Sequence, residues 1–316
     1  MMLLGVCVAV MAAAAPPDSA TVDSLPWRLS GLGSLAETGV QRGQVLEPAG
    51  LAVDVFGRTY VTDAALHRLQ WFDRNGRLLG ETGSLGSDRG QMRRPGSVTP
   101  LGAARVAVLD RENRRVLTYD LFGRPLDAID LTADRFVSGT GAIDPIALAS
   151  DRGGALYIVD AARERILALD FSGNLQRTID RGAAGSQFRG LHGLAVAPRG
   201  DLITAEVVGA RIQRFDLGGR PRASWSVPRS PGVKRSGALA VAVDDTGRVA
   251  VADEAAGTVW VYDANGVPLA RLAGLSAPRA VAFAPGGVVL VAETAPGRVR
   301  RFQLAPAPPG AAGSPR

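Results

Sequence analysis

Short apolar runs alternate with glycine-containing turns along almost the whole chain. The run at 51–53 consists of apolar residues and ends at a glycine turn, and the run at 59–62 alternates in polarity and ends at Asp63. Runs of this length and composition between glycines indicate β-strands. A third run at 68–72 leads into a second glycine turn, and a fourth begins at Leu78. The pattern predicts four antiparallel strands in a unit of about 46 residues, the size of a propeller blade.

This unit is repeated six times. The segment 50–63 returns as 193–206, and weaker copies occur elsewhere in the same order. An acidic residue closes the second strand of each copy, namely Asp63, Asp110, Asp160, Glu206, Asp253 and Glu293. Asp-x-x-Gly turns follow the third strand in five copies, beginning at Asp73, Asp120, Asp170, Asp216 and Asp263. We therefore predict an all-β, six-bladed β-propeller with four antiparallel strands in each blade.

A strand from the N-terminus is expected to complete the last blade. The sixth copy reaches its third strand at 298–302, and a proline-rich segment that cannot continue as a strand follows. A segment at 27–32 precedes the first copy and is similar to the fourth strand of that copy. We predict a propeller at 27–304, closed by this N-terminal strand, and a disordered tail at 305–316.

The repeat resembles the unit of NHL-repeat propellers. In the first copy, Pro48-Ala49-Gly50-Leu51-Ala52-Val53-Asp54 is followed by Asp63-Ala64-Ala65-Leu66-His67-Arg68-Leu69 and by Phe72-Asp73-Arg74-Asn75-Gly76. These segments match the three motifs of the NHL unit in the same order. The resemblance implies a rigid ring whose loops bind other molecules, and some NHL propellers bind RNA on a basic face.

The N-terminal segment is expected to be a targeting signal. Residues 1–15 hold an apolar run that is too short to span a bilayer and that ends in small residues. This is typical of a secretory signal peptide, followed here by a linker at 16–26, although no Lys or Arg precedes Arg28 and a short hydrophobic anchor is the alternative. Cleavage would remove Cys7, the one cysteine, so we expect a periplasmic or secreted protein without disulfides and without a stable membrane span.

The net charge of +6 and the isoelectric point near 10.3 could indicate an anionic partner. However, the basic residues are nearly all arginines and are scattered among acids instead of forming a block. No phosphate-binding loop and no Gly-x-Ser-x-Gly motif is present. We therefore expect no nucleic-acid partner, while keeping nucleic-acid binding as a third possibility.

The closing acids could form a ring of carboxylates for a metal, but a structural role is the preferred interpretation. An arginine stands five residues after the acid in five copies, at a spacing that suits an ion pair across one hairpin, and Thr258 takes that place in the sixth. Exposed pairs of this kind contribute well under about 1 kcal/mol each. The predicted pairs are Asp63–Arg68, Asp110–Arg115, Asp160–Arg165, Glu206–Arg211 and Glu293–Arg298, with Asp253 lacking an arginine.

The residues just before each first strand are expected to point into the mouth of the central channel. By repeat alignment these are Ala49, Pro95, Asp144, His192, Leu239 and Arg279. Asp144, His192 and Arg279 are the polar members and are our candidate ligand-binding residues. His192 resembles a zinc ligand of the amidating lyase propeller, but one imidazole cannot hold a catalytic zinc ion. Gluconolactonase-like propellers place metal-binding acids where this chain has Ala49 and Leu239, so we predict no metal, no cofactor and no catalytic residue.

Three functions remain open at this stage. The preferred one is a non-catalytic, monomeric binding module for a protein, peptide, glycan or small ligand at the cell envelope, because the ring is complete and its mouth holds few reactive groups. The alternative is a metal-assisted hydrolase or lyase of the gluconolactonase, streptogramin lyase or amidating lyase type. The third is a nucleic-acid-binding NHL propeller.

Overall fold

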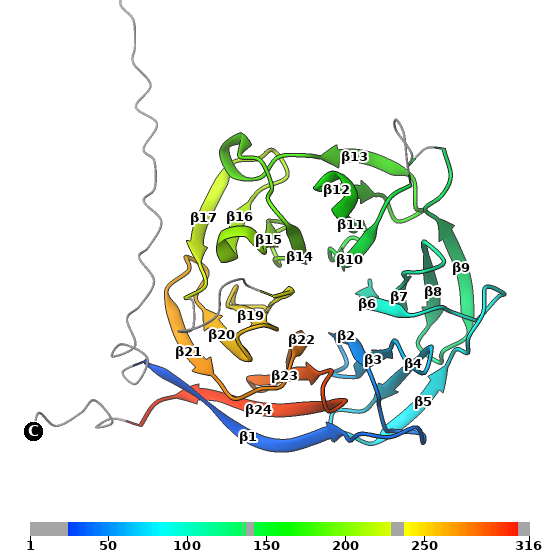
Figure 1. Cartoon of the computed structure of the whole chain (residues 1–316), viewed down its shortest axis with the longest axis horizontal. Coiled ribbons are helices and arrows are strands. Elements are labelled where there is room, and N and C mark those ends of the chain that lie inside the picture. The colour runs from blue at the N-terminus through cyan, green and yellow to red at the C-terminus, as the bar shows by residue number, and fades with distance from the viewer. Residues whose placement is uncertain (1–24, 135, 137–141, 229–236, 309–316) are drawn as a thin grey trace, which may run out of the picture.

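Six four-stranded antiparallel sheets are arranged as blades around a central channel (Figure 1). The computed structural model describes residues 25–134, 136, 142–228 and 237–308. The sheet order confirms the predicted all-β, six-bladed propeller with four strands in each blade. In the part of the chain that is described, no helix is long and apolar enough to cross a membrane.

The strands of each blade follow one another from the channel to the rim, and most of them are five or six residues long. The first three blades consist of β2 (Pro48–Val53), β3 (Thr59–Asp63), β4 (Arg68–Phe72) and β5 (Leu78–Thr82); β6 (Pro95–Leu101), β7 (Arg105–Asp110), β8 (Arg115–Asp120) and β9 (Pro125–Asp130); and β10 (Pro145–Ser150), β11 (Leu156–Asp160), β12 (Arg165–Leu169) and β13 (Leu175–Ile179). The other three consist of β14 (Leu191–Val196), β15 (Leu202–Glu206), β16 (Arg211–Phe215) and β17 (Pro221–Ser226); β18 (Leu239–Val243), β19 (Val249–Asp253), β20 (Thr258–Tyr262) and β21 (Pro268–Leu272); and β22 (Pro278–Ala284), β23 (Val288–Glu293), β24 (Arg298–Pro306) and β1 (Trp27–Ala36). Short 3-10 turns lie at η1 (Ala161–Arg163), η2 (Ala183–Gly185) and η3 (Val208–Ala210).

The N-terminal strand β1 pairs with β24 and supplies the fourth strand of the sixth blade, as predicted. The pairing extends from Trp27 opposite Pro306, so the last strand ends two residues beyond the predicted boundary at 304. Beyond that pair, the carbonyl oxygen of Pro26 accepts the N–H of Ala307 at 2.8 Å. The predicted signal peptide at 1–15 and most of the predicted linker and tail lie outside the described residues.

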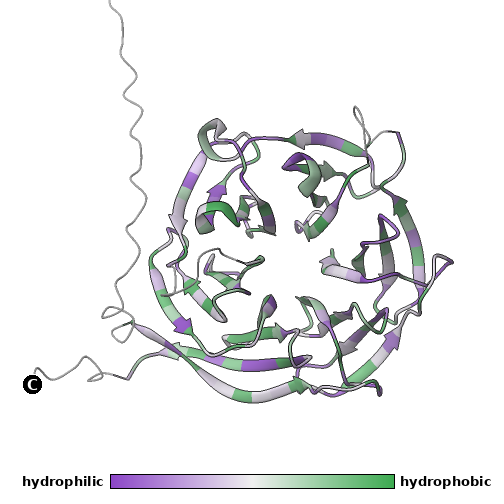
Figure 2. Ribbon diagram, viewed as in Figure 1, coloured by the Kyte–Doolittle hydropathy of each residue, from purple (hydrophilic) through white to green (hydrophobic). Residues whose placement is uncertain are grey.

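The core is distributed between neighbouring blades, and each hydrophobic cluster joins residues of two adjacent sheets. Trp225 of the fourth blade packs on Tyr262 of the fifth with ring centroids 5.4 Å apart, for example. The outer strands carry both hydrophobic and hydrophilic residues (Figure 2), and in β17 the buried Ala223 and Trp225 alternate with the exposed Arg222 and Ser224. This alternation fits a strand with one face against the neighbouring blade and the other in solvent.

The Asp-x-x-Gly turns hold the third and fourth strands together. Asp73 accepts the backbone N–H groups of Asn75 and Arg77 at 2.8 and 2.9 Å, and Gly76 takes a φ of 91°, which favours glycine. The N–H of Arg77 makes the largest contribution to lowering the pKa of Asp73 below its ordinary value. The same arrangement recurs at Asp120 and Asp170, so this turn is a rigid element of the repeat.

The six closing acids are buried, so the small contribution of exposed ion pairs does not apply to them. Asp160 is completely buried and accepts the Nε–H of Arg165 at 2.8 Å and the backbone N–H of Asp144 at 3.0 Å. Equivalent arginine pairs join Asp110 to Arg115, Glu206 to Arg211 and Glu293 to Arg298 at 2.6 to 2.8 Å. Each acid therefore fixes the loop that leads into the first strand of its own blade.

The first blade departs from the predicted pairing. Asp63 accepts the backbone N–H groups of Leu46 and Glu47 at 2.8 and 3.2 Å, whereas Arg68 donates to Glu81 at 3.1 Å. The predicted Asp63–Arg68 pair is therefore wrong, because Glu81 on the fourth strand offers a second carboxylate to the guanidinium group. In the fifth blade Asp253 has no arginine partner among the described residues, and burial raises its pKa.

Candidate binding site at the channel mouth

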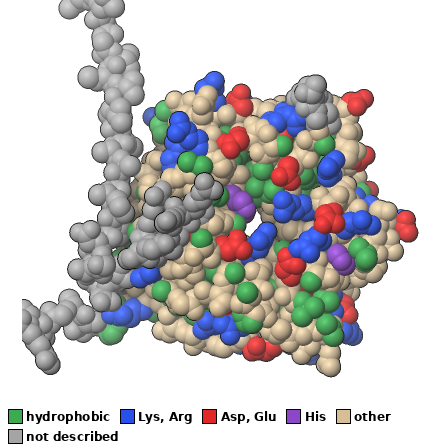
Figure 3. All heavy atoms as spheres, in the orientation of Figure 1, with side chains coloured by type: hydrophobic (Ala, Val, Ile, Leu, Met, Phe, Trp, Pro, Cys, Tyr) green, Lys and Arg blue, Asp and Glu red, His purple; other side chains and the backbone are tan. Residues whose placement is uncertain are grey.

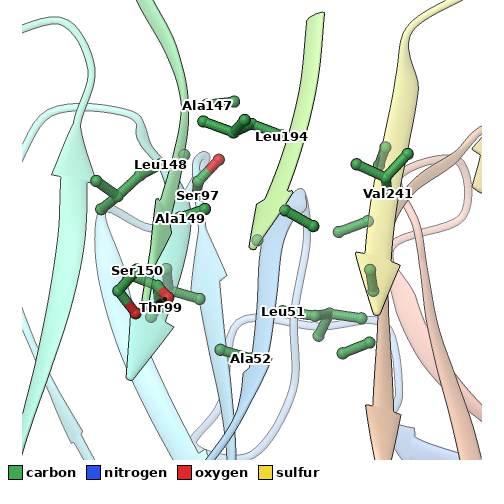
Figure 4. Close-up of a pocket in the computed structure, with 18 of the residues that line it drawn as sticks. Leu51, Ala52, Ser97, Thr99, Ala147, Leu148, Ala149, Ser150, Leu194 and Val241 are labelled. Carbon is green, nitrogen blue, oxygen red and sulfur yellow. Dashed lines mark hydrogen bonds between the residues drawn. The ribbon is translucent and has the colours of Figure 1, made fainter. Parts of the chain in front are cut away.

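A cavity of about 1090 Å³ occupies the centre of the ring and is lined by all six inner strands. Aliphatic side chains such as Leu51, Leu194 and Val241 face its middle (Figure 4), whereas charged residues such as Asp144 and Arg279 line its ends, so that polar and apolar groups share the wall about equally. Thr99 and Ser150 place a pair of hydroxyl groups in the wall, with their oxygens 2.8 Å apart. A wall that combines apolar and polar groups can hold a small ligand or an extended chain with both kinds of surface.

β-Bulges aim selected side chains at the mouth of this cavity. In most blades the first residue of the inner strand pairs with the closing acid, and the next residue is left unpaired in a bulge. His192 and Arg279 occupy these bulge positions in the fourth and sixth blades. A bulge leaves the extra residue unpaired and redirects its side chain, so both residues are held in defined positions at the mouth.

The register corrects part of the predicted set of mouth residues. Pro95, Pro145 and Leu239 pair with their closing acids, so the position equivalent to His192 is taken by Ile146 in the third blade. Asp144 precedes the strand, yet it still lines the cavity. Blades one, three, four and six share one register, in which the bulge residue lies 14 residues before the closing acid, so counting back from Asp160 selects Ile146.

Asp144 and Arg279 are paired with charged residues from neighbouring blades that the sequence analysis did not select. Asp144, whose side chain is 52% exposed, lies 3.6 Å from the guanidinium group of Arg111. Arg279 contacts Glu254 at 3.4 Å. Arg111 and Glu254 each follow a closing acid directly, so their positions in the repeat could have indicated a place at the mouth.

His192 is held as a neutral imidazole. Its Nδ1 lies 3.2 Å from the carbonyl oxygen of Leu239, an acceptor, so this nitrogen carries the proton and Nε2 presents a lone pair. Burial lowers the pKa of His192, and the positive charges of Arg279 and Arg111 act in the same direction. These effects outweigh the opposing influence of the Leu239 carbonyl and of Glu254. His192, Arg111 and Arg279 all line the same cavity.

The rest of the rim carries charges of both signs, and they are already paired. Arg94 contacts Glu47 at 2.5 Å and Glu112 at 3.8 Å, which joins the first two blades. Acidic and basic side chains surround the opening on this face (Figure 3). A rim of matched charges favours polar ligands over a strongly charged one.

The donor set does not fit the metal centre of a gluconolactonase-type propeller. Within residues 25–134, 136, 142–228 and 237–308, no three His, Cys, Asp or Glu side chains converge on one point. Asp144 and Glu47 each face an arginine, which competes with a cation for the carboxylate.

No family model matches the sequence. The chain is 28% identical over 144 residues to Protein brain tumor of Drosophila melanogaster, and the match covers 44% of this chain but only 13% of that protein.

Solved structures with similar folds include several propeller enzymes. A streptogramin B lyase aligns with a TM-score of 0.65 and 12% identity over 88% of this chain and 98% of the lyase. The virginiamycin B lyase of Staphylococcus aureus aligns with a TM-score of 0.61 and 12% identity over 88% of this chain and 100% of the lyase. A gluconolactonase of Xanthomonas campestris aligns with a TM-score of 0.61 and 15% identity over 83% of this chain and 87% of the lactonase. At these identities the likeness shows the fold, and the protein is a six-bladed β-propeller similar to both groups.

Proposed function

We propose that this protein is an exported, non-catalytic propeller of the NHL type that binds an amide-bearing ligand, such as a peptide, at the channel mouth. The six repeats and the similarity to Protein brain tumor support the NHL assignment. The sequence of residues 1–15 supports export, which N-terminal sequencing of the protein recovered from the periplasm would check.

The proposal is carried by the position of His192, which lines the same cavity as Arg279 and Arg111 and whose Nδ1–H is held by the carbonyl oxygen of Leu239. The free lone pair on Nε2 accepts one hydrogen bond, and the guanidinium groups of Arg279 and Arg111 donate others. An amide supplies both partners at once, because its carbonyl accepts from arginine and its N–H donates to the imidazole. A carboxylate offers no proton to Nε2, and an ammonium group offers no oxygen that could accept from the arginines.

Aliphatic side chains in the channel wall favour a ligand that also has an apolar part. An apolar chain attached to the amide can extend inward past Leu51 and Leu194 and leave water, which favours binding in proportion to the area buried. The preferred ligand class therefore has a polar amide head and an apolar body, as a short peptide or an acylated amide has.

Isothermal titration with hexanamide as the probe tests this site. We expect hexanamide to bind more tightly than hexylammonium at neutral pH, and His192→Ala to weaken binding by about three- to tenfold, the value of one hydrogen bond. His67→Ala is the matched control, since His67 does not line the cavity, and it should bind as the parent protein does. Equal binding of hexanamide and hexylammonium, or an unaffected His192→Ala variant, would contradict the proposal.

The state of His192 also favours a second candidate function, a lyase or hydrolase. A neutral imidazole can accept a proton from a substrate, and the neighbouring arginines can stabilise developing negative charge. Incubation with virginiamycin B or gluconolactone, followed by mass spectrometry, distinguishes the two functions. A product formed by the parent protein and not by His192→Ala would replace the binding function with this one.

A further inference from the structure

We propose that the face of the propeller opposite the channel mouth docks onto a lipid bilayer surface. This face, here called the far face, carries the turns between first and second strands and those between third and fourth strands. Because neighbouring strands are antiparallel, both sets of turns point away from the mouth. The proposal concerns this surface alone and does not depend on the ligand bound at the mouth.

Exposed aromatic side chains stand on three of these turns. Phe56, Phe122 and Phe171 are 58%, 86% and 73% exposed and come from the first, second and third blades. Exposing a phenyl group to water is unfavourable, and three blades each expose one on this face.

The turns that carry these phenylalanines are rigid. Asp54 accepts the backbone N–H of Phe56 and Asp120 accepts that of Phe122, each at 2.9 Å. The side chains are therefore fixed outward on hydrogen-bonded turns. Single aromatic groups projecting from separate turns suit a fluid lipid surface, into which each can insert, better than one shaped protein pocket.

The same turns carry aspartates and arginines in similar numbers, but the arginine side chains extend further from them. The carboxylates of Asp120 and Asp216 accept backbone N–H groups within their own turns, and Asp245 pairs with Arg152 at 2.7 Å. Six other arginines on or beside these turns are exposed, namely Arg74, Arg77, Arg105, Arg124, Arg199 and Arg220. Their guanidinium groups can contact anionic phosphates at the depth where the phenyl rings enter the interface.

The chain also enters the propeller on the far face. Trp27 pairs with Pro306 at the end of β24 that lies on this face, and the guanidinium group of Arg248, next to a far-face turn, lies 5.2 Å from its ring. The segment that precedes Leu25 therefore joins the propeller on the side that bears the phenylalanines. In the alternative in which residues 1–15 are a retained hydrophobic anchor, this location brings the far face to the membrane, which favours a lipid surface over a protein partner as the occupant. Docking through the far face leaves the channel mouth open to solution.

Binding of the full chain to vesicles of phosphatidylcholine, with and without phosphatidylglycerol, tests the proposal. We expect stronger binding to the anionic vesicles, and the triple variant Phe56→Ser, Phe122→Ser, Phe171→Ser should bind at least about tenfold more weakly. The matched control replaces Val40, Leu85 and Val208 by serine, because these are 64%, 58% and 57% exposed on the mouth side. It should bind as the parent chain does.

Spin labels report the orientation independently of the total affinity. In a Cys7→Ser background, a nitroxide at Phe122→Cys should become accessible to oxygen and protected from a water-soluble nickel complex when vesicles are added. A nitroxide at Leu85→Cys should stay accessible to nickel. Equal exposure of both labels, or unchanged binding of the triple variant, would overturn the proposal. Concentration-dependent self-association without lipid, abolished in the triple variant, would instead assign the face to a second copy of the chain.

Discussion

At the scale of single residues, the closing acids connect the sequence repeat to the geometry of the channel. Asp160 accepts hydrogen bonds from Arg165, from Arg163 and from the backbone N–H of Asp144, so one carboxylate ties the second strand to the loop before the first. Because this carboxylate is completely buried, its contribution to stability depends on keeping these partners.

Replacing Asp160 by asparagine should therefore be costly, whereas Asp253→Asn should not be. Asp160→Asn removes the negative charge that compensates the buried guanidinium group of Arg165. This should lower the free energy of unfolding by about 3 kcal/mol. Asp253 accepts backbone N–H groups such as that of Ala256 and burial already disfavours its charge, so asparagine should cost less than about 1 kcal/mol.

Urea unfolding of the two variants and the parent protein measures this difference. Equal losses of stability would show that the arginine partner contributes nothing and would refute the role given to the pair. The sequence indicated the Asp160–Arg165 pair through its spacing, but it could not show the burial, because burial depends on the loop that covers the carboxylate.

At the scale of elements, small residues allow the inner strands to approach one another. Thr62 Oγ1 of the first blade donates to the carbonyl oxygen of Gly96 in the second. A Cβ at Gly50 would meet this same carbonyl and would lie 2.8 Å from Thr62 Oγ1, closer than van der Waals contact allows. Gly50 is thus required by this contact between the first two blades, whereas the equivalent positions of the third, fifth and sixth blades hold Ala147, Ala240 and Ala280.

Gly50→Ala should destabilise the propeller by about 1 to 3 kcal/mol, because the added methyl group forces two inner strands apart. Gly31→Ala is the matched control, since a Cβ at Gly31 in β1 meets nothing within 4 Å. Thermal unfolding followed by circular dichroism should show a lowered midpoint for the first variant and an unchanged or raised one for the second. A control that unfolds as early as Gly50→Ala would contradict this explanation.

The bulges are the part of the elements that the sequence did not reveal. The sixfold pattern predicted the strands and their order, because alternation and glycine turns are local signals. The predicted mouth residue Asp144 lies two residues before the bulge, although the third blade has the same register as the fourth and sixth. Ile146, not Asp144, is the counterpart of His192 and Arg279.

At the scale of the whole molecule, the ring separates two surfaces with different chemistry. The mouth holds paired charges around a neutral His192, and the far face holds exposed phenylalanines and arginines. The closed ring of blades, completed by β1, keeps the two surfaces on opposite ends of one rigid body.

Ring closure could be predicted from the sequence because the last copy lacks a fourth strand and the N-terminal segment contains one extra strand that can fill its place. The pairs at the mouth could not be predicted in the same way. Arg111 meets Asp144 and Glu254 meets Arg279 only after neighbouring blades are packed, and no local pattern encodes those contacts.

The most direct test of the mouth site is nuclear magnetic resonance of the two histidines, His67 and His192, as a function of pH and hexanamide. The folded state favours the neutral form of His192, so the pKa of His192 should lie below 6.5. The stability that the neutral imidazole contributes should therefore be lost as the pH falls below 6.5. At neutral pH, hexanamide should shift the His192 signal saturably and leave that of His67 in place. A pKa of His192 at or above 6.5, or a His192 signal that ignores hexanamide, would contradict the account.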